Sequence, residues 1–146
     1  MPSLFLERHV QHLADRMFEL VNDLEDYPRF VPNCKDMQVK ADPTAADVRL
    51  AKMTIQFGPV TQSYTSRVVA NPADKTITAT ATDGPFSYLS SKWSFEPEGA
   101  GARIRLDLDF KISNPLIATV AEAAFSAKQE QIMDAFVDEA DRRFGD

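Results

Sequence analysis

The spacing of apolar residues near the start of the chain predicts a strand followed by a short helix. Residues 4–12 begin with apolar side chains at alternating positions, which is typical of a strand. From residue 14 to residue 24 the apolar positions recur every three or four residues, as on one face of a helix. The apolar stripe predicted for this helix consists of Leu13, Met17, Leu20, Val21 and Leu24.

Residues 26–34 are expected to form a turn or a single helical turn that carries exposed aromatic side chains. Pro28 and Pro32 lie four residues apart in this segment. Proline interrupts a helix because it has no backbone N–H and its ring clashes with the preceding turn. A long helix is therefore excluded here.

Residues 37–112 show the two-residue period of β-strands. Val48 and Leu50 are out of phase with the apolar residues that follow them, which predicts a β-bulge near Leu50. Gly58 and Pro59 are expected to bend the chain into the next strand. The later strands are predicted at residues 61–70, 75–82, 86–96 and 103–112. Because short turns join them, the predicted sheet is antiparallel.

A long helix is predicted at the C-terminal end of the sequence. Asn114 is expected to cap it and Pro115 to occupy its first helical position. The helical pattern runs over residues 116–144, a length of about 43 Å, and Gly145 ends it. This length exceeds that of any predicted strand, so the helix should lie diagonally across a wide, curved sheet. Its apolar stripe contains Leu116, Ile117, Val120, Ala124, Phe125, Ile132, Met133, Phe136, Val137 and Ala140.

The order of these elements predicts an α+β fold. A curved antiparallel sheet would wrap around the long C-terminal helix, and one or two short helices would follow the first strand. No internal repeat, low-complexity segment or Gly/Ser-rich linker divides the sequence. The 146 residues match the usual size of one domain, so we expect a single domain over residues 1–146.

Small residues on the predicted inner surfaces leave two interpretations open. Ile77, Ala79 and Ala81 share one strand face, and the middle of the long helix offers Ala121, Ala124, Ser126 and Ala127. Facing small residues either let two backbones approach closely or line a void. An apolar void with a few polar groups is the usual form of a small-molecule site.

The charge balance disfavours a nucleic-acid partner. The sequence has 22 acidic and 16 basic residues, giving a net charge of −6. Such a surface repels phosphate backbones unless a basic patch overrides it. The densest basic pair, Arg142 and Arg143, is flanked by Asp141 and Asp146. Direct DNA binding is therefore not expected.

Cysteine content and hydropathy indicate the compartment. Cys34 is the only cysteine, so no intrachain disulfide can form and the chain suits a reducing compartment. No signal peptide is visible, and no run of about 18 apolar residues suggests a transmembrane helix. We expect a soluble, cytoplasmic protein, with a peripheral contact to the inner membrane left open.

Few residues could support catalysis. His9 and His12 lie on or near the predicted first strand, where their side chains would face opposite ways, so a metal site is not expected. Cys34 has no histidine near it in sequence, which favours a buried structural thiol over a nucleophile. Asp107 and Asp109 alternate with apolar residues and fit a solvated outer face better than a catalytic pair. The sequence thus predicts neither an enzyme nor a catalytic cofactor.

Three segments together resemble the coenzyme Q-binding family of the START and polyketide-cyclase-like superfamily. They are residues 21–34, with Tyr27-Pro28-Arg29-Phe30 and Cys34; residues 84–95, with Gly84-Pro85-Phe86 and Trp93; and residues 110–136, with Asn114-Pro115-Leu116, Phe125 and Phe136. The resemblance implies a helix-grip fold with a deep apolar cavity for ubiquinone or a related polyprenyl quinone. It also implies a lipid carrier or chaperone that supports respiratory electron transport and has no catalytic triad.

The same resemblance implies which residues line the cavity. Phe30 and Val31 would lie on a loop at its mouth, and the other positions would lie on the strands or on the helix wall. Apolar residues at such spacings also fit a solid core, so about half of the set is expected to touch ligand. The set predicted to bind the ligand is Phe30, Val31, Phe57, Tyr64, Ala79, Phe86, Leu89, Trp93, Phe95, Leu116, Val120, Ala124 and Phe125.

Two positions depart from the family pattern. The family often has tryptophan where Asn33 precedes Cys34, and it commonly has arginine where Glu139 precedes Ala140. The first departure bears on how this loop meets a membrane. The loop around Phe30 could enter a bilayer, and packing against its own domain is an equally good alternative.

Two other functions are left open by the sequence. The same family includes a bacterial toxin described as blocking ribosomal subunit association, so ribosome contact is the first alternative, although the negative charge argues against direct RNA contact. Polyketide aromatases and cyclases share the fold, and a fold does not define a function. An enzyme of that kind would need polar groups in the cavity, for which the candidates are Arg8, Tyr64, Ser66 and Tyr88.

Overall fold

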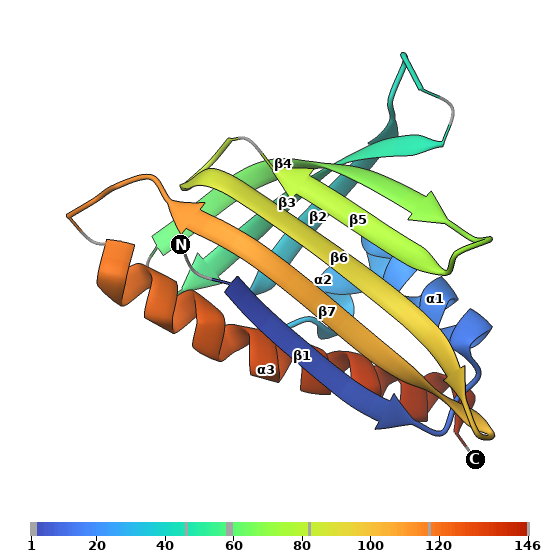
Figure 1. Cartoon of the computed structure of the whole chain (residues 1–146). Helices are drawn as coiled ribbons and strands as arrows, with labels where there is room; N and C mark the ends of the chain where they lie inside the picture. The colour runs from blue at the N-terminus through green and yellow to red at the C-terminus, as the bar shows by residue number, and fades with distance from the viewer. Residues whose placement is uncertain (1–2, 46, 58–59, 82, 117, 146) are drawn as a thin grey trace.

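The computed structural model describes residues 3–45, 47–57, 60–81, 83–116 and 118–145, with the backbone alone at residues 57 and 60. The helices and strands follow one another along the chain in much the order that the sequence predicts (Figure 1). In chain order they are β1 (Ser3–Val10), α1 (Ala14–Asn22), the 3-10 turn η1 (Leu24–Asp26), α2 (Tyr27–Phe30), β2 (Cys34–Ala41), β3 (Val48–Phe57), β4 (Val60–Asn71), β5 (Thr76–Ala81), β6 (Phe86–Glu98), β7 (Gly101–Ile112) and α3 (Ala118–Phe144).

Within the described residues, the strands form one antiparallel sheet in the order β1-β7-β6-β5-β4-β3-β2. The first strand pairs with the last, from Ser3 opposite Asp109 to Val10 opposite Ala102. Gly101 permits this close approach, because an added Cβ would lie 2.0 Å from the carbonyl oxygen of Val10. Figure 1 shows α3 running diagonally along the curved sheet. The predicted α+β helix-grip fold is confirmed.

The alternation in β7 explains how the sheet acquires an inner and an outer face. Its apolar residues are buried at every second position, Ile104, Leu106, Leu108, Phe110 and Ile112. The charged residues between them point outward, and Asp109 is exposed. The outer-face interpretation of the aspartates on this strand is therefore correct.

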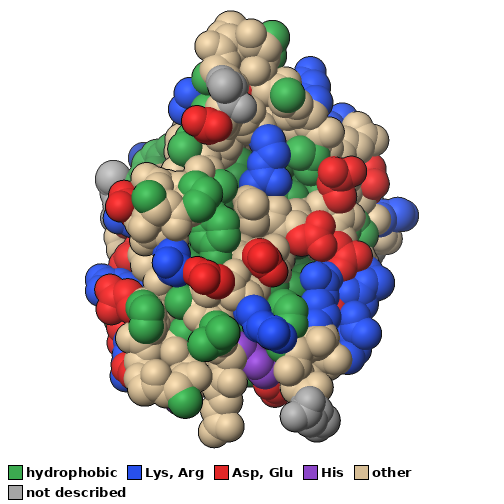
Figure 2. All heavy atoms as spheres, turned by 90° about the vertical axis from the view of Figure 1, so that its right-hand side faces the viewer, with side chains coloured by type: hydrophobic (Ala, Val, Ile, Leu, Met, Phe, Trp, Pro, Cys, Tyr) green, Lys and Arg blue, Asp and Glu red, His purple; other side chains and the backbone are tan. Residues whose placement is uncertain are grey.

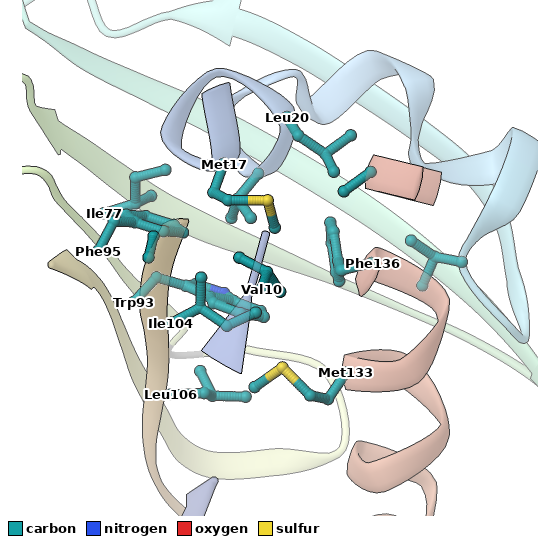
Figure 3. Packing of buried hydrophobic residues seen from close by; sticks show 14 of the residues in the cluster. Val10, Met17, Leu20, Ile77, Trp93, Phe95, Ile104, Leu106, Met133 and Phe136 are labelled. Atoms are coloured by element: carbon teal, nitrogen blue, oxygen red, sulfur yellow. The ribbon is translucent and has the colours of Figure 1, made fainter. Parts of the chain in front are cut away.

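Two apolar clusters hold α3 against the sheet. In the larger one, Phe136 of α3 meets Trp93 of β6 edge-to-face with ring centroids 5.2 Å apart, and Trp93 stacks on Phe95. Figure 3 shows Phe136 and Met133 reaching from α3 into this cluster. In the smaller one, Phe125 packs on Phe110 and Phe86 with centroid distances of 4.7 and 5.2 Å. The helix is thus anchored at two places along its length.

Two predictions about individual apolar residues are wrong. Leu13 is 56% exposed, because it precedes α1 in an extended conformation and lies outside the helical stripe. Pairing continues through Leu50 opposite Arg67 without a register shift. Leu50 breaks the apolar alternation because it is an apolar residue on the outer face, and the irregular pairings lie instead between Cys34 and Asp36 and between residues 86 and 88.

The start of the long helix also differs from the prediction. The Oδ1 atom of Asn114 accepts a hydrogen bond from the backbone N–H of Leu116 at 3.0 Å, which makes a local turn, and α3 begins at Ala118. Leu116 and Val120 are 92% and 77% exposed, because this end of the helix extends past the sheet, at the left of Figure 1. The predictions for Ile117 and for the bend at residues 58–59 lie outside the described residues.

The segment between the two prolines forms the single helical turn α2, as predicted. Its aromatic side chains are not exposed, however. Tyr27 and Phe30 are half-buried and meet Phe136 with centroid distances of 5.2 and 5.3 Å, and Val31 is buried. Of the two alternatives for this loop, the structure shows packing against its own domain. Among the helices of the described residues, none has the length and apolar character that a membrane span requires.

Candidate ligand-binding cavity

A cavity lies on the inner face of the sheet, partly beneath α3 and partly beneath η1 and α2. It has two lobes of about 130 and 120 Å³. The two lobes are adjacent and share a central wall. This wall consists of Tyr27, Met53, Tyr64, Leu89, Ser91 and Trp93.

The two lobes are bounded by different parts of the fold. The first lobe reaches α3 at Phe125, Gln129 and Phe136, and it reaches the segment after α2 at Val31. The second lobe lies against the small residues of the sheet, with Ala79 of β5 in its wall. Ile77 and Ala79 therefore line a void where β5 faces α2 and η1. Ala81 and Ala121 belong instead to the smaller apolar cluster, so the small residues of β5 and α3 do not enclose this void together.

A surface groove continues the first lobe toward the start of α3. It has a volume of about 220 Å³ and shares Ile55, Phe125 and Lys128 with that lobe. Its outer walls are apolar residues from the start of β6, the end of β7 and α3: Pro85, Phe86, Ile112, Ala121 and Ala124. The groove therefore adjoins the first lobe.

The cavity holds one weakly paired phenol at its centre. The hydroxyl of Tyr64 donates to the sulfur of Met53 at 3.3 Å, and a thioether is a weak acceptor. The hydroxyl of Tyr27, by contrast, donates to the backbone carbonyl of Val21. Burial raises the pKa of both tyrosines, so both hydroxyls keep their protons at neutral pH. Tyr64 is thus a neutral donor available to a carbonyl oxygen in the cavity.

Comparison with known proteins agrees with this geometry. Residues 10–137 match the family described as "Polyketide cyclase / dehydrase and lipid transport". The chain belongs to this family. It is 32% identical over 133 residues to the ribosome association toxin RatA of Pseudomonas aeruginosa, covering 90% of each chain. It is 29% identical over 127 residues to the mitochondrial coenzyme Q-binding protein coq10 of Schizosaccharomyces pombe, covering 85% of this chain and 77% of coq10.

Solved structures show the same fold at lower identity. The Zhui aromatase/cyclase from Streptomyces superposes with a TM-score of 0.81 at 16% identity, covering 97% of this chain and 94% of the enzyme. The resemblance predicted from the three sequence segments is confirmed at the level of the superfamily, which is a hydrophobic-ligand-binding fold.

In this member of the family, most of the residues predicted to bind ligand border the cavity or its groove. Val31, Tyr64, Ala79, Leu89, Trp93 and Phe125 line the lobes, and Phe86, Ala124 and again Phe125 line the groove. Which of them touch a ligand stays a prediction.

Four other predicted positions do not border it. Phe30 packs on Phe136 outside the cavity. Phe95 stacks on Trp93 and meets Phe18 in a T-shaped contact, with ring centroids 6.0 Å apart. Leu116 and Val120 project into solvent beyond the groove lining. The side chain of Phe57 lies outside the described residues.

Several lining residues were missed from the sequence. Met53 and Ser91 face the cavity from β3 and β6, and Gln129 and Ile132 face it from α3. Met53 and Ser91 each lie two positions from a residue that lines the cavity, so the strand period alone would have found them. Gln129 is buried, and its amide donates to the carbonyl of Phe125 at 3.3 Å.

The candidate catalytic groups do not come together. Tyr64 and Ser66 line the cavity, but Arg8 pairs with Glu130 on the outside, and Tyr88 borders none of the cavity lobes or the groove. His12 is buried beside Asp141, with Nε2 and Oδ1 2.8 Å apart, and His9 instead pairs with Glu98. In the part of the chain that the structure describes, no group of three His, Cys, Asp or Glu side chains could hold a metal ion.

The loop that contains Asn33, where the sequence departs from the family pattern, is hydrogen-bonded to the sheet. Asn33 has a φ of 66°, and its side-chain amide donates to the carbonyl of Gln56 at 2.8 Å. Asparagine is among the few residues that adopt this left-handed conformation readily. Next to it, burial raises the pKa of the Cys34 thiol to about 11, and the charge of Asp36 adds to the effect. The thiol is buried, as predicted.

Proposed function

We propose that this protein binds ubiquinone or a related polyprenyl quinone in the two-lobed cavity and carries it in support of respiratory electron transport. The observation that carries the proposal is the cavity itself, an apolar space with one neutral phenol donor at its centre and an apolar groove leading out. The similarity to coq10, whose name states that it binds coenzyme Q, supports the choice of ligand.

The dimensions suit a ring in the interior and a tail in the groove. An apolar cavity of about 150 Å³ is known to accept a benzene ring, and the first lobe has about 130 Å³. Tyr64 would donate to a quinone carbonyl there, beside the indole of Trp93. The prenyl tail would follow the groove past Phe125, where each buried methylene contributes about 0.8 kcal/mol.

We propose carriage without chemical change. Lys128 and Gln129 border the first lobe from α3, whereas Tyr64 and Ser91 bring neutral hydroxyls to the shared wall and Ser66 brings one to the second lobe. The pKa of Tyr64 is raised by burial, which makes this hydroxyl a poor general acid or base at neutral pH. Such groups orient a ligand better than they transfer its protons.

Association with the ribosome is the second candidate. One observation favours it, the 32% identity to the toxin RatA over 90% of the chain. This activity would use the outer surface rather than the cavity. The net charge of −6 favours contact with a ribosomal protein over contact with RNA.

The decisive experiment is native mass spectrometry and organic extraction of the protein purified from a quinone-producing cell. We expect near-stoichiometric prenyl quinone. A protein that emerges empty, and stays empty when offered ubiquinone in detergent, would contradict the carrier function. Co-sedimentation with ribosomal subunits over a range of salt concentrations, measured on the same preparation, would then test the second candidate.

A further inference from the structure

The start of α3 and the turn before it form an exposed surface with almost no charge. Leu116 and Val120 are 92% and 77% exposed, which makes them the most exposed large apolar side chains of the described residues. Residues 113–127 contain one charged residue, Glu122, and its carboxylate accepts a hydrogen bond from the backbone N–H of Ile112 at 2.9 Å. Apolar side chains thus face solvent here in a segment whose single charged side chain is hydrogen-bonded to the backbone.

This exposed surface is continuous with the cavity groove. Ala121, Ala124 and Phe125 line the groove from α3. Val120 is the direct neighbour of Ala121 and lies one helical turn before Ala124, so its side chain extends the apolar surface outward from the groove. The uncharged segment therefore borders the opening through which an apolar ligand would pass.

Charge is segregated along the length of α3. The segment 128–144 contains eight charged residues, against one in residues 113–127. Lysines flank the uncharged segment on both sides, Lys111 at the end of β7 and Lys128 at the groove. The opposite end of the molecule, which faces the viewer in Figure 2, carries many acidic and basic side chains. The first part of α3 is thus poor in charge and its second part rich in charge.

We propose that the surface formed by residues 113–116 and 118–127 docks on a lipid bilayer, so that the quinone passes between the bilayer and the groove without crossing water. This inference rests on the proposed function. An exposed apolar helix face bordered by lysines is the pattern of helices that lie in the membrane interface. A second copy of the chain packed on the same surface would cover the groove and block ligand entry, which favours the bilayer as the occupant.

The test is flotation with vesicles of phosphatidylcholine and phosphatidylglycerol in equal parts, without quinone. The double variant Leu116→Asp/Val120→Asp places two charges on the docking surface and leaves the cavity lining unchanged. The matched control is Phe5→Asp/Leu13→Asp, which charges two other exposed apolar residues, 48% and 56% exposed. We expect the docking variant to lose at least about tenfold in vesicle partitioning and the control to float like wild type.

Quinone uptake from detergent micelles separates this inference from the proposed function. The docking variant should take up ubiquinone from micelles as wild type does, because neither substituted side chain lines the cavity. Equal flotation of wild type and docking variant, or no flotation of wild type, would overturn the docking surface even if quinone binds. A concentration-dependent dimer that the docking variant abolishes would also overturn it, because it would identify a second copy as the occupant.

Discussion

Arg29 of α2 donates to the carboxylate of Glu139 near the end of α3, which ties the helical turn beside the cavity to the C-terminal helix. Arg142 and Arg143 donate to the same carboxylate. Glu139 is only 5% exposed. Hydrogen bonds from Arg142, and then from Arg29 and Arg143, lower its pKa far below the ordinary range. Glu139, which departs from the family pattern, thus forms the centre of an ionic cluster with three arginines.

Glu139→Gln should destabilise the fold by about 2 kcal/mol at neutral pH, because a nearly buried carboxylate loses charge-assisted hydrogen bonds. The folded-state pKa lies below the ordinary value of 4.5, so this contribution is complete above pH 4.5 and is lost as the pH falls below it. Urea unfolding of both proteins across that range measures the difference. Glu130→Gln is the control, because Glu130 is 54% exposed and pairs with Arg8 at the surface, where a pair contributes about 0–1 kcal/mol. Equal effects of the two substitutions, or a difference that does not shrink in acid, would contradict the cluster's role.

Ser91→Leu should reduce quinone binding by at least about tenfold, because the larger side chain fills the wall shared by the two lobes. Trp93 is the only tryptophan and lines both lobes, so quenching of its fluorescence by the quinone reports binding directly. Ser90→Leu is the matched control, because Ser90 directly precedes Ser91 on β6 and is exposed to solvent. Unchanged quenching in a folded Ser91→Leu protein would place the ligand elsewhere.

Tyr64→Phe should weaken ubiquinone binding about five- to tenfold, the effect of one lost hydrogen bond. Stability should change little, because the hydroxyl donates only to the sulfur of Met53. Titration of Trp93 fluorescence measures the first effect, and thermal unfolding measures the second. The ligand-side control is squalene, a prenyl hydrocarbon without carbonyl groups, measured by displacement of quinone. If the variant loses affinity for squalene and quinone alike, Tyr64 shapes the cavity and does not donate to the headgroup.

Cys34 should resist alkylation in the native protein. Its pKa of about 11, against an ordinary 9.0, makes the reactive thiolate about a hundredfold scarcer at neutral pH. The rate of iodoacetamide labelling, followed by mass spectrometry, should rise steeply with pH and jump when urea unfolds the chain. The unfolded chain is the internal control, since Cys34 is the only thiol. A native rate equal to the unfolded rate at neutral pH would show that the thiol is neither buried nor perturbed.

The strand pattern could be predicted because the sheet has one buried face. Ile104, Leu106 and Leu108 are buried and the charged residues between them face outward, so a period of two fixed both the strand and its orientation. Leu50 shows where this reasoning fails. An apolar residue on the outer face has the same sequence signal as a register shift, and only the pairing with Arg67 separates the two.

The cavity was harder to predict, because lining and core positions look alike along a strand. Leu89 and Phe95 are both apolar and both buried on the inner side of β6, yet Leu89 lines the cavity and Phe95 is covered by Phe18. Val120 fits the apolar stripe of α3 but extends past the sheet. Such differences depend on where one element ends relative to another, which residue spacing within an element does not record.

The pairing of β1 with β7 has a consequence for folding. Ser3 lies opposite Asp109, and the strands that follow each other in sequence, β1 and β2, occupy opposite edges of the sheet. On a ribosome the chain emerges from its N-terminus, so β1 leaves long before its partner exists. Pairings between residues so far apart in sequence are slow to form. Among the strands of this sheet, β1 therefore remains unpaired for longest, until Ile112 at the end of β7 has emerged.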